Sequence, residues 1–184
     1  MEVPASGELA GNTDQQTALL PAAAFRDVEW PELMPADDLE AIMNPPEYLQ
    51  DIEDGSPEDQ IASQLANPGD PVTDDRYQQA LVSTRVVDAM NGQPVRIPGF
   101  IVPLEFDDQQ MVTEFFLVPF FGACIHVPPP PPNQIIYVSY PQGFQLAALT
   151  DPFWISGVLE TSMTENAMAT AAYAMEMQRF EPYN

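Results

Sequence analysis

One short stretch of the sequence, residues 122–134 (GACIHVPPPPPNQ), has residue types and spacing that suit chemistry. It contains the only Cys, Cys124, and the only His, His126, of the 184 residues. If this stretch is extended, its period of two puts both side chains on one face, with β-carbons about 7 Å apart. A thiolate and an imidazole in that arrangement are ligands for a borderline-soft ion such as zinc or copper. We call residues 122–134 the Cys-His segment and take Cys124 and His126 as its candidate metal ligands.

A metal site needs more ligands than these two. Because the chain has no second Cys or His, the remaining ligands must come from a second chain or from carboxylates, and the nearest are Glu105, Asp107, Asp108 and Glu114. Such a ligand set is weaker than the closed set of a structural zinc site. The composition therefore favours a labile or transfer site.

Two other interpretations of the same pair remain open. Cys124 and His126 can form a thiolate–imidazolium pair with a nucleophilic sulfur, and Asn133 is then the nearest residue that can orient the imidazole. Alternatively, Cys124 is a small buried hydrophobic side chain and His126 hydrogen-bonds a backbone carbonyl, as isolated Cys and His residues commonly do. The first interpretation predicts a thiol-dependent enzyme, and the second predicts a purely structural role.

Five prolines, residues 128–132, follow the pair. Each ring fixes φ and removes an N–H donor, so the run predicts a short, stiff polyproline II rod. Such a rod either docks into an aromatic groove of a partner or forms a rigid loop of the fold. Asn133 and Gln134, directly after the rod, are candidate binding residues that either hydrogen-bond a ligand or clamp the loop.

The charge of the chain is strongly negative. Twenty-eight acidic residues stand against five basic ones, all of them Arg, for a net charge of -23. Nucleic-acid binding depends on cations, so this composition argues against a nucleic-acid partner. It favours either attraction of cations and basic partners or a solubility adaptation. No stretch approaches the roughly 20 apolar residues of a transmembrane helix, so no transmembrane segment is expected.

The first part of the chain predicts a leader and a helical arm. Residues 1–24 have no apolar period and predict a flexible leader. Residues 25–80 predict a helical N-terminal arm, since apolar residues recur at helical spacing from Trp30 to Met43 and Pro35 precedes two acidic residues at a helix start. A second helix is expected over residues 56–66.

Residues 81–184 predict a β-domain that carries the Cys-His segment. A hairpin is expected from Leu81 to Phe106 around an Asn91-Gly92 turn. Further strands are expected over residues 112–119, 134–140, 153–160 and 171–180. Gly99 and Gly157 lie within predicted strands, which fits strands that bend sharply. The expected fold is mainly β (α+β), a small OB-like antiparallel β-barrel with an N-terminal helical arm. The alternatives are a β-sandwich and an open α+β sheet.

Three parts of the sequence resemble a bacterial domain family of unknown function found in exported proteins. They are residues 30–35 (WPELMP), residues 96–105 (RIPGFIVPLE) and residues 114–138, which include the Cys-His segment. The resemblance covers about residues 28–183 and maps the family's motif residues onto Cys124, His126, Asn133 and Gln134. It implies a periplasmic or lipoprotein-like protein without established enzymatic activity. It also implies an association with ABC transporter components for metal uptake, especially zinc uptake, because some members of the family are encoded beside them.

Together these observations predict a periplasmic accessory or binding protein, associated with metal handling or with an ABC transporter. Its partner would be a transporter or another envelope protein. The alternatives are a thiol-dependent enzyme that uses Cys124 and His126, and a protein-docking module with no ligand. The start of the sequence reads like a mature N-terminus with an added Met, so we expect that a signal peptide has been removed, and a lipid anchor is compatible with this.

Overall fold

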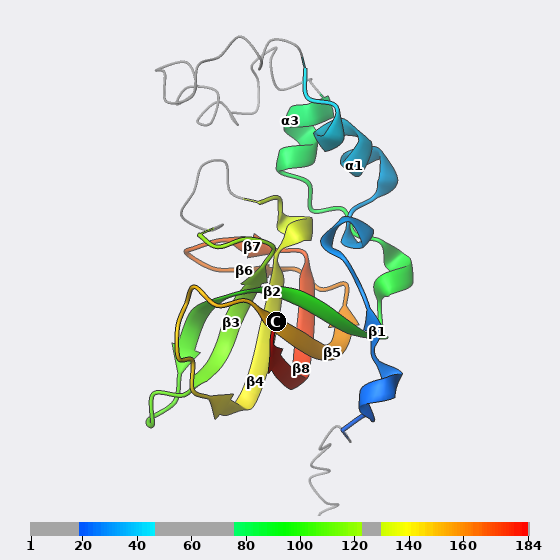
Figure 1. Ribbon diagram of the computed structural model, residues 1–184. Coiled ribbons are helices and arrows are strands. Elements are labelled where there is room, and N and C mark those ends of the chain that lie inside the picture. The colour runs from blue at the N-terminus through cyan, green and yellow to red at the C-terminus, as the bar shows by residue number, and fades with distance from the viewer. Residues whose placement is uncertain (1–18, 47–75, 123–129, 184) are drawn as a thin grey trace, which may run out of the picture.

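The computed structural model describes residues 19–46, 76–122 and 130–183 (Figure 1). Three predictions fall wholly or partly outside these ranges. They are residues 1–18 of the leader, the helix expected over residues 56–66, and the central part of the Cys-His segment with Cys124 and His126.

Five strands close into a barrel. In chain order they are β2 (Gln93–Phe106), β3 (Val112–Val118), β4 (Ile136–Phe144), β5 (Phe153–Glu160) and β8 (Tyr173–Pro182). Their order in the sheet is β2-β3-β4-β8-β5, and β5 pairs back onto β2. All of these pairs are antiparallel except β4–β8, which is parallel. This five-stranded topology is that of an OB fold, so the prediction of a small OB-like barrel with a helical arm is confirmed.

The long strand β2 pairs with two neighbouring strands. Its first half, Gln93 to Gly99, pairs with β5, and its second half, from Phe100, pairs with β3. Gly99 lies at the change of partner, where a β-carbon would be 2.8 Å from the carbonyl oxygen of Val118. Glycine is therefore needed where β2 leaves one neighbour for the other.

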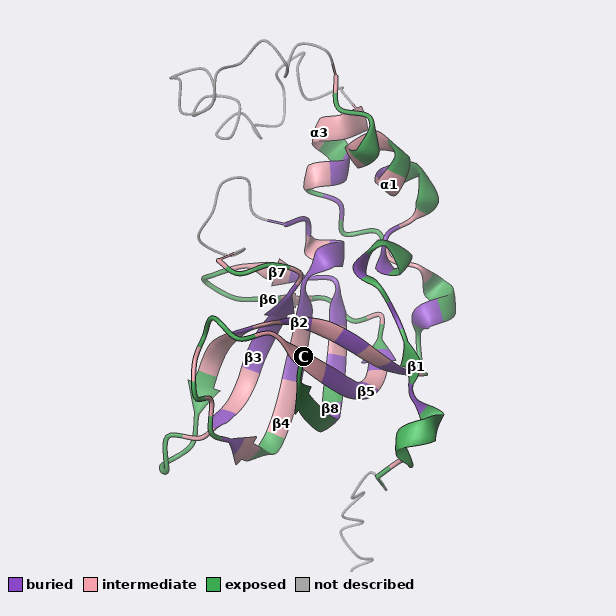
Figure 2. Ribbon diagram, in the orientation of Figure 1, coloured by how far each residue is buried: buried purple, intermediate pink, exposed green. Residues whose placement is uncertain are grey.

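The barrel strands bury one face in a common core and pack several outer side chains into a second cluster. Val95, Ile97 and Ile101 of β2 point into the core. Phe100 and Val102 alternate with them and pack in the outer cluster, around Phe116, Val118, Ile135 and Ala171. The two-stranded sheet of β6 (Thr164–Glu165) and β7 (Thr170–Ala171) contributes Ala171 to this outer cluster. Figure 2 shows the buried residues along the barrel strands.

The N-terminal arm belongs to the same core as the barrel. It comprises the strand β1 (Arg26–Asp27), the 3-10 helix η2 (Trp30–Leu33), and the helices α1 (Ala36–Met43) and α3 (Arg76–Leu81). The 3-10 helix η1 (Ala22–Ala24) precedes the arm, at the end of the predicted leader. The arm contributes Val28, Trp30 and Leu33 to the barrel core. The hydroxyl of Tyr173 in β8 donates to the Leu33 carbonyl at 2.8 Å and accepts from the Val87 N–H at 2.7 Å. Arm and barrel are thus joined by apolar packing and by a buried tyrosine.

The ends of the arm differ from the sequence predictions. Helix α1 begins after Pro35 as expected, with acidic residues in its first turn. The strand expected from Leu81 is wrong, because Leu81 ends α3 and the following residues up to Val87 join no sheet. The predicted Asn91-Gly92 turn exists, but it leads from the 3-10 helix η5 (Asp88–Met90) into β2. Residues 82–87 are held by polar contacts with the arm and with the Tyr173 hydroxyl. These contacts replace the pairing with a neighbouring strand that the sequence predicted.

Part of the predicted leader contacts the barrel. The Leu20 N–H donates to Gln178 Oε1 at 2.8 Å, and Arg179 Nη2 donates to the Leu20 carbonyl at 3.0 Å. Across the described ranges, no helix has the length and apolar character needed to cross a membrane.

Candidate functional site

The structure describes both ends of the Cys-His segment, and Cys124 and His126 themselves lie outside the described residues. We call residues 119–122 the first flank and residues 130–134 the second flank. The first flank leaves the end of β3 and exposes two aromatic side chains, Phe120 and Phe121. The second flank ends in the 3-10 helix η6 (Pro132–Gln134) and leads into β4.

The two flanks converge on the arm. Residues of both flanks and of the arm line one apolar pocket, among them Met34, Ile42, Leu81, Pro119, Phe120 and Pro131. Pro130 and Pro131 are buried. Docking of the polyproline run onto a partner requires exposed prolines, so these two are not available for it. In its described part the run is a rigid element of the fold.

Gln134 fastens the second flank to the arm. Its Nε2 donates to the Trp30 carbonyl at 2.9 Å and to the Asn133 carbonyl at 3.0 Å. The backbone adds further bonds, because the Ala172 N–H donates to the Pro132 carbonyl at 2.8 Å. Through these hydrogen bonds, the second flank is fixed to the arm and to the residue that precedes β8.

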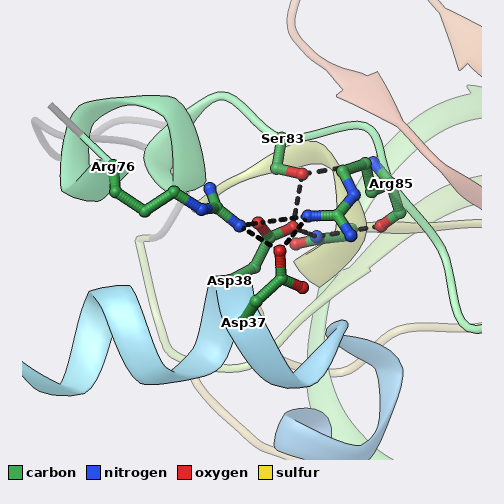
Figure 3. Close-up of polar contacts among 6 residues, drawn as sticks. Asp37, Asp38, Arg76, Ser83 and Arg85 are labelled. Atoms are coloured by element: carbon green, nitrogen blue, oxygen red, sulfur yellow. Dashed lines mark hydrogen bonds and ion pairs between the residues drawn. The ribbon is translucent and has the colours of Figure 1, made fainter. Parts of the chain in front are cut away.

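A buried carboxylate lies next to the second flank, in a cluster of polar and charged side chains that Figure 3 shows. Asp38 of α1 has no exposed surface, and its Oδ2 accepts from the Ser83 hydroxyl at 2.6 Å. Its Oδ1 accepts from Arg85 Nη1 at 3.2 Å and from Arg76 Nη2. The neighbouring Asp37 pairs with the same two guanidinium groups, which hold the pKa of its carboxyl well below the usual range. One pair of aspartates therefore ties α1 to α3 and to the stretch that follows it.

Asn133, near the end of the Cys-His segment, joins the segment to this ion cluster. Its side chain is fully buried, and its Nδ2 donates to the Arg85 carbonyl at 3.0 Å and lies 3.5 Å from Asp38 Oδ2. Both of those neighbours are acceptors, so the amide orientation is fixed. Asn133 Oδ1 is buried and finds no hydrogen-bond donor among the described residues. Within the described ranges, the segment therefore has one buried acceptor without a donor.

The carboxylates that the sequence offered as additional metal ligands lie elsewhere. Glu105 and Glu114 face each other across β2 and β3, and Asp107 and Asp108 lie at or next to the turn between these strands. Asp107 Oδ1 accepts the N–H groups of Gln109 and Met111, so it shapes this turn. The turn is at the opposite end of β3 from the first flank, about 20 Å away at the rise of a strand.

The described residues contain no alternative metal centre. Within residues 19–46, 76–122 and 130–183, no three His, Cys, Asp or Glu side chains lie close enough together to hold a metal ion. A site with three such side chains would therefore use at least one residue outside these ranges.

Tyr137 of β4 is a titratable group near the facing glutamates. Burial, a hydrogen bond with Glu114 and the negative charges of Glu114 and Glu105 raise its pKa to about 12. Because the folded state favours the protonated phenol, its contribution to stability is complete below pH about 10. That contribution is lost as the pH rises toward 12.

Replacement of Glu114 by Gln is expected to lower the pKa of Tyr137 partway toward its ordinary value, because the burial remains. Ultraviolet titration of phenolate absorbance measures this, with Tyr137→Phe to assign the signal. Glu105→Gln is the matched control and should have a smaller effect, since Glu105 acts only through its charge. Equal effects of the two substitutions would contradict the direct contact with Glu114.

Sequence reasoning selected Asn133 and Gln134 but missed Asp38, Ser83 and Arg85. The sequence offered one indication of this cluster, the small number of Arg residues. Where a few Arg residues stand among many carboxylates, each Arg is expected to form an ion pair. That indication does not say which carboxylate is buried. The contact between Asp38 and Arg85 joins residues 47 positions apart.

One protein family and one crystal structure are similar to this chain. The family model described as "Protein of unknown function (DUF3299)" matches residues 30–182. The crystal structure of a DUF3299 family protein from Pseudomonas aeruginosa PAO1 is similar, with 36% sequence identity and a TM-score of 0.63. The match covers 88% of this chain and 97% of that chain. The search of curated proteins gives no match. The barrel, the arm and the clamped segment are therefore those of a member of the DUF3299 family, to which this chain belongs.

Proposed function

We propose that this protein is an exported, non-enzymatic binding protein that holds a labile zinc or copper(I) ion through Cys124 and His126. The observation that carries the proposal is the fixation of both ends of the Cys-His segment. β3 holds the first flank, and buried hydrogen bonds of Asn133 and Gln134 hold the second. A segment with fixed ends presents its ligands at a lower entropic cost than a free loop.

The expected ligand set suits transfer rather than storage. A thiolate and an imidazole supply two soft or borderline ligands, and copper(I) and zinc both accept them. The carboxylates of the β2–β3 turn are far from both flanks, so the other ligands would come from water or from a molecule that receives the ion. An incompletely coordinated ion exchanges readily, as delivery to a partner requires.

Titration calorimetry of the reduced protein with zinc and with copper(I) tests this function. We expect binding by the wild-type protein and its loss in both Cys124→Ser and His126→Ala. Asp107→Asn is the control and should bind as the wild type does, because that carboxylate belongs to the β2–β3 turn. Absence of binding, or binding unchanged by both substitutions, would rule out the metal function.

A periplasmic location and a transporter partner form part of the same proposal. They are supported by the resemblance to exported proteins encoded near metal-linked ABC transporter components. Fractionation of the native host with an antibody against this protein tests the location. Recovery in the cytoplasmic fraction would refute export, whatever the calorimetry shows.

A thiol-dependent enzyme is the second candidate, and the buried Asn133 Oδ1, which finds no donor among the described residues, favours it. The side-chain amide of an Asn orients the imidazole in some cysteine–histidine enzymes. This candidate expects Cys124 to be alkylated rapidly by iodoacetamide below pH 7, and more slowly in His126→Ala and in Asn133→Ala. A thiol that is inert in the native protein would eliminate it.

A further inference from the structure

An apolar groove runs along the outer side of the barrel, next to the second half of β2. Four parts of the chain line it: β2 with Phe100 and Val102, the first flank with Phe121, the β4–β5 connection with Leu149, and the β6–β7 turn with Met168. Its volume is about 170 Å³, below the range of about 300 to 1,000 Å³ typical of small-molecule sites. The groove therefore suits a single apolar side chain better than a cofactor or metabolite.

The walls of the groove expose apolar surface to solvent. Phe121, Leu149 and Met168 are each about half exposed, at 51%, 53% and 52%. The Phe121 ring nevertheless has a fixed neighbour, because it meets Phe100 edge-on with 6.2 Å between ring centroids. Met168 is unbranched and adapts to varied shapes. One rigid aromatic wall and one adaptable wall are features of a protein-binding surface.

No Arg residue lines the groove. Every one of the five Arg residues contacts a residue between Leu20 and Asp38. These contacts are Arg26 with Glu32, Arg76 and Arg85 with Asp37, Arg96 with Asp27, and Arg179 with the Leu20 carbonyl. The sequence contains no Lys. Among the described residues, each side-chain cation is therefore already engaged with the N-terminal part of the chain.

The segments that form the groove carry exposed carboxylates close by in sequence. Glu105 follows Pro103 of the groove by two residues, Asp151 follows Leu149 by two, and Glu165 precedes Met168 by three. The net charge of the whole chain is -23, and these exposed carboxylates add negative charge to the segments that form the groove. A negative field attracts a cationic partner and repels an anionic one.

We propose that this groove docks a Lys- or Arg-rich polypeptide, which inserts one aliphatic or aromatic side chain between Phe121, Leu149 and Met168. The flanking cations of the partner then meet the carboxylates of the surrounding segments. The apolar contact gives the affinity, and the charges give the orientation and the rate of association. This surface goes beyond the metal function proposed above, because it uses neither Cys124 nor His126.

Fluorescence anisotropy with three labelled peptides tests the docking surface. The first peptide has one Leu between pairs of Lys, the second has Ser in place of the Leu, and the third has Glu in place of each Lys. We expect the first to bind about tenfold more tightly than the second, from burial of the Leu side chain. The third should not bind.

Substitutions on the protein locate the contact. Leu149→Ala and Met168→Ala are each expected to weaken binding of the first peptide about fivefold. Met43→Ala, on the 72% exposed side chain at the end of α1, is the matched control and should change nothing. All three positions are exposed, so the variants are expected to fold, and circular dichroism checks this.

Three results would overturn the docking proposal. One is equal binding of the Leu and Ser peptides, which would show charge attraction alone. Another is binding of the Leu peptide that is absent or insensitive to both groove substitutions. The last is self-association of the protein in analytical ultracentrifugation that Leu149→Ala abolishes, since a second copy would then occupy the groove.

Discussion

Replacement of Gly157 by alanine is expected to lower the free energy of unfolding by about 3 kcal/mol, a large effect for one methyl group. Gly157 lies in β5 at a shift of register with β8, between Ser156 and Gly157. A β-carbon there would collide with the carbonyl oxygen of Glu176 and lie 2.6 Å from Cγ of Met175. The carbonyl belongs to the backbone of β8, so it cannot move away without disturbing the pairing that closes the barrel.

Chemical denaturation of Gly157→Ala measures this cost, and Gly92→Ala is the matched control. Gly92 has a positive φ of 74° and no atom within 4 Å of an added β-carbon. Its substitution therefore adds only backbone strain, about 1 kcal/mol. An equal loss of stability in the two variants would contradict the explanation that glycine is needed at position 157 because β5 packs closely against β8.

Replacement of Asp38 by alanine is the second large effect that we expect, with a loss of about 2 to 3 kcal/mol in the free energy of unfolding. The substitution removes charge-assisted hydrogen bonds to Arg76, Arg85 and Ser83 from a carboxylate with no exposed surface. Hydrogen bonds to charged groups contribute about 1.5 to 3 kcal/mol. The total stays below a simple sum because both guanidinium groups are partly exposed and remain hydrated.

Asp37→Asn is the matched control for Asp38→Ala. Asp37 pairs with the same guanidinium groups, but its side chain is 54% exposed, so its removal is expected to change stability much less. The pH dependence has a definite sign, because the guanidinium groups lower the pKa of Asp37 from its ordinary 3.8. Its contribution is complete above that value and is lost as the pH falls below it. Asp37→Asn should therefore flatten the acid side of the stability profile.

The Asp38 substitution also has a consequence for the Cys-His segment. Asp38 anchors Ser83, whose carbonyl accepts the Asn133 N–H at 3.3 Å. We expect amide hydrogen exchange at Asn133 and Gln134 to accelerate in Asp38→Ala but not in Asp37→Asn. Unchanged exchange in Asp38→Ala would show that the second flank is held without the ion cluster.

Local sequence patterns determined much of the secondary structure. Pro35 followed by acidic residues marked the start of α1, and runs of β-branched and aromatic residues marked β3, β4 and β5. The same patterns failed at Leu81 to Val86. There, contacts of Ser83 with Asp38 and of Val87 with Tyr173 outweigh the β-propensity of the local residues.

The Cys-His segment was recognised from composition alone, since the only Cys and the only His stand before five prolines. The tertiary structure decided how the ends of that segment are held. It buried Asn133 and Gln134 against the arm and placed Glu105 and Glu114 opposite each other on β2 and β3. It also joined four separate parts of the chain into the apolar groove. Periodicity reports only on neighbours within a few residues, whereas these features depend on contacts between residues that lie far apart in the sequence.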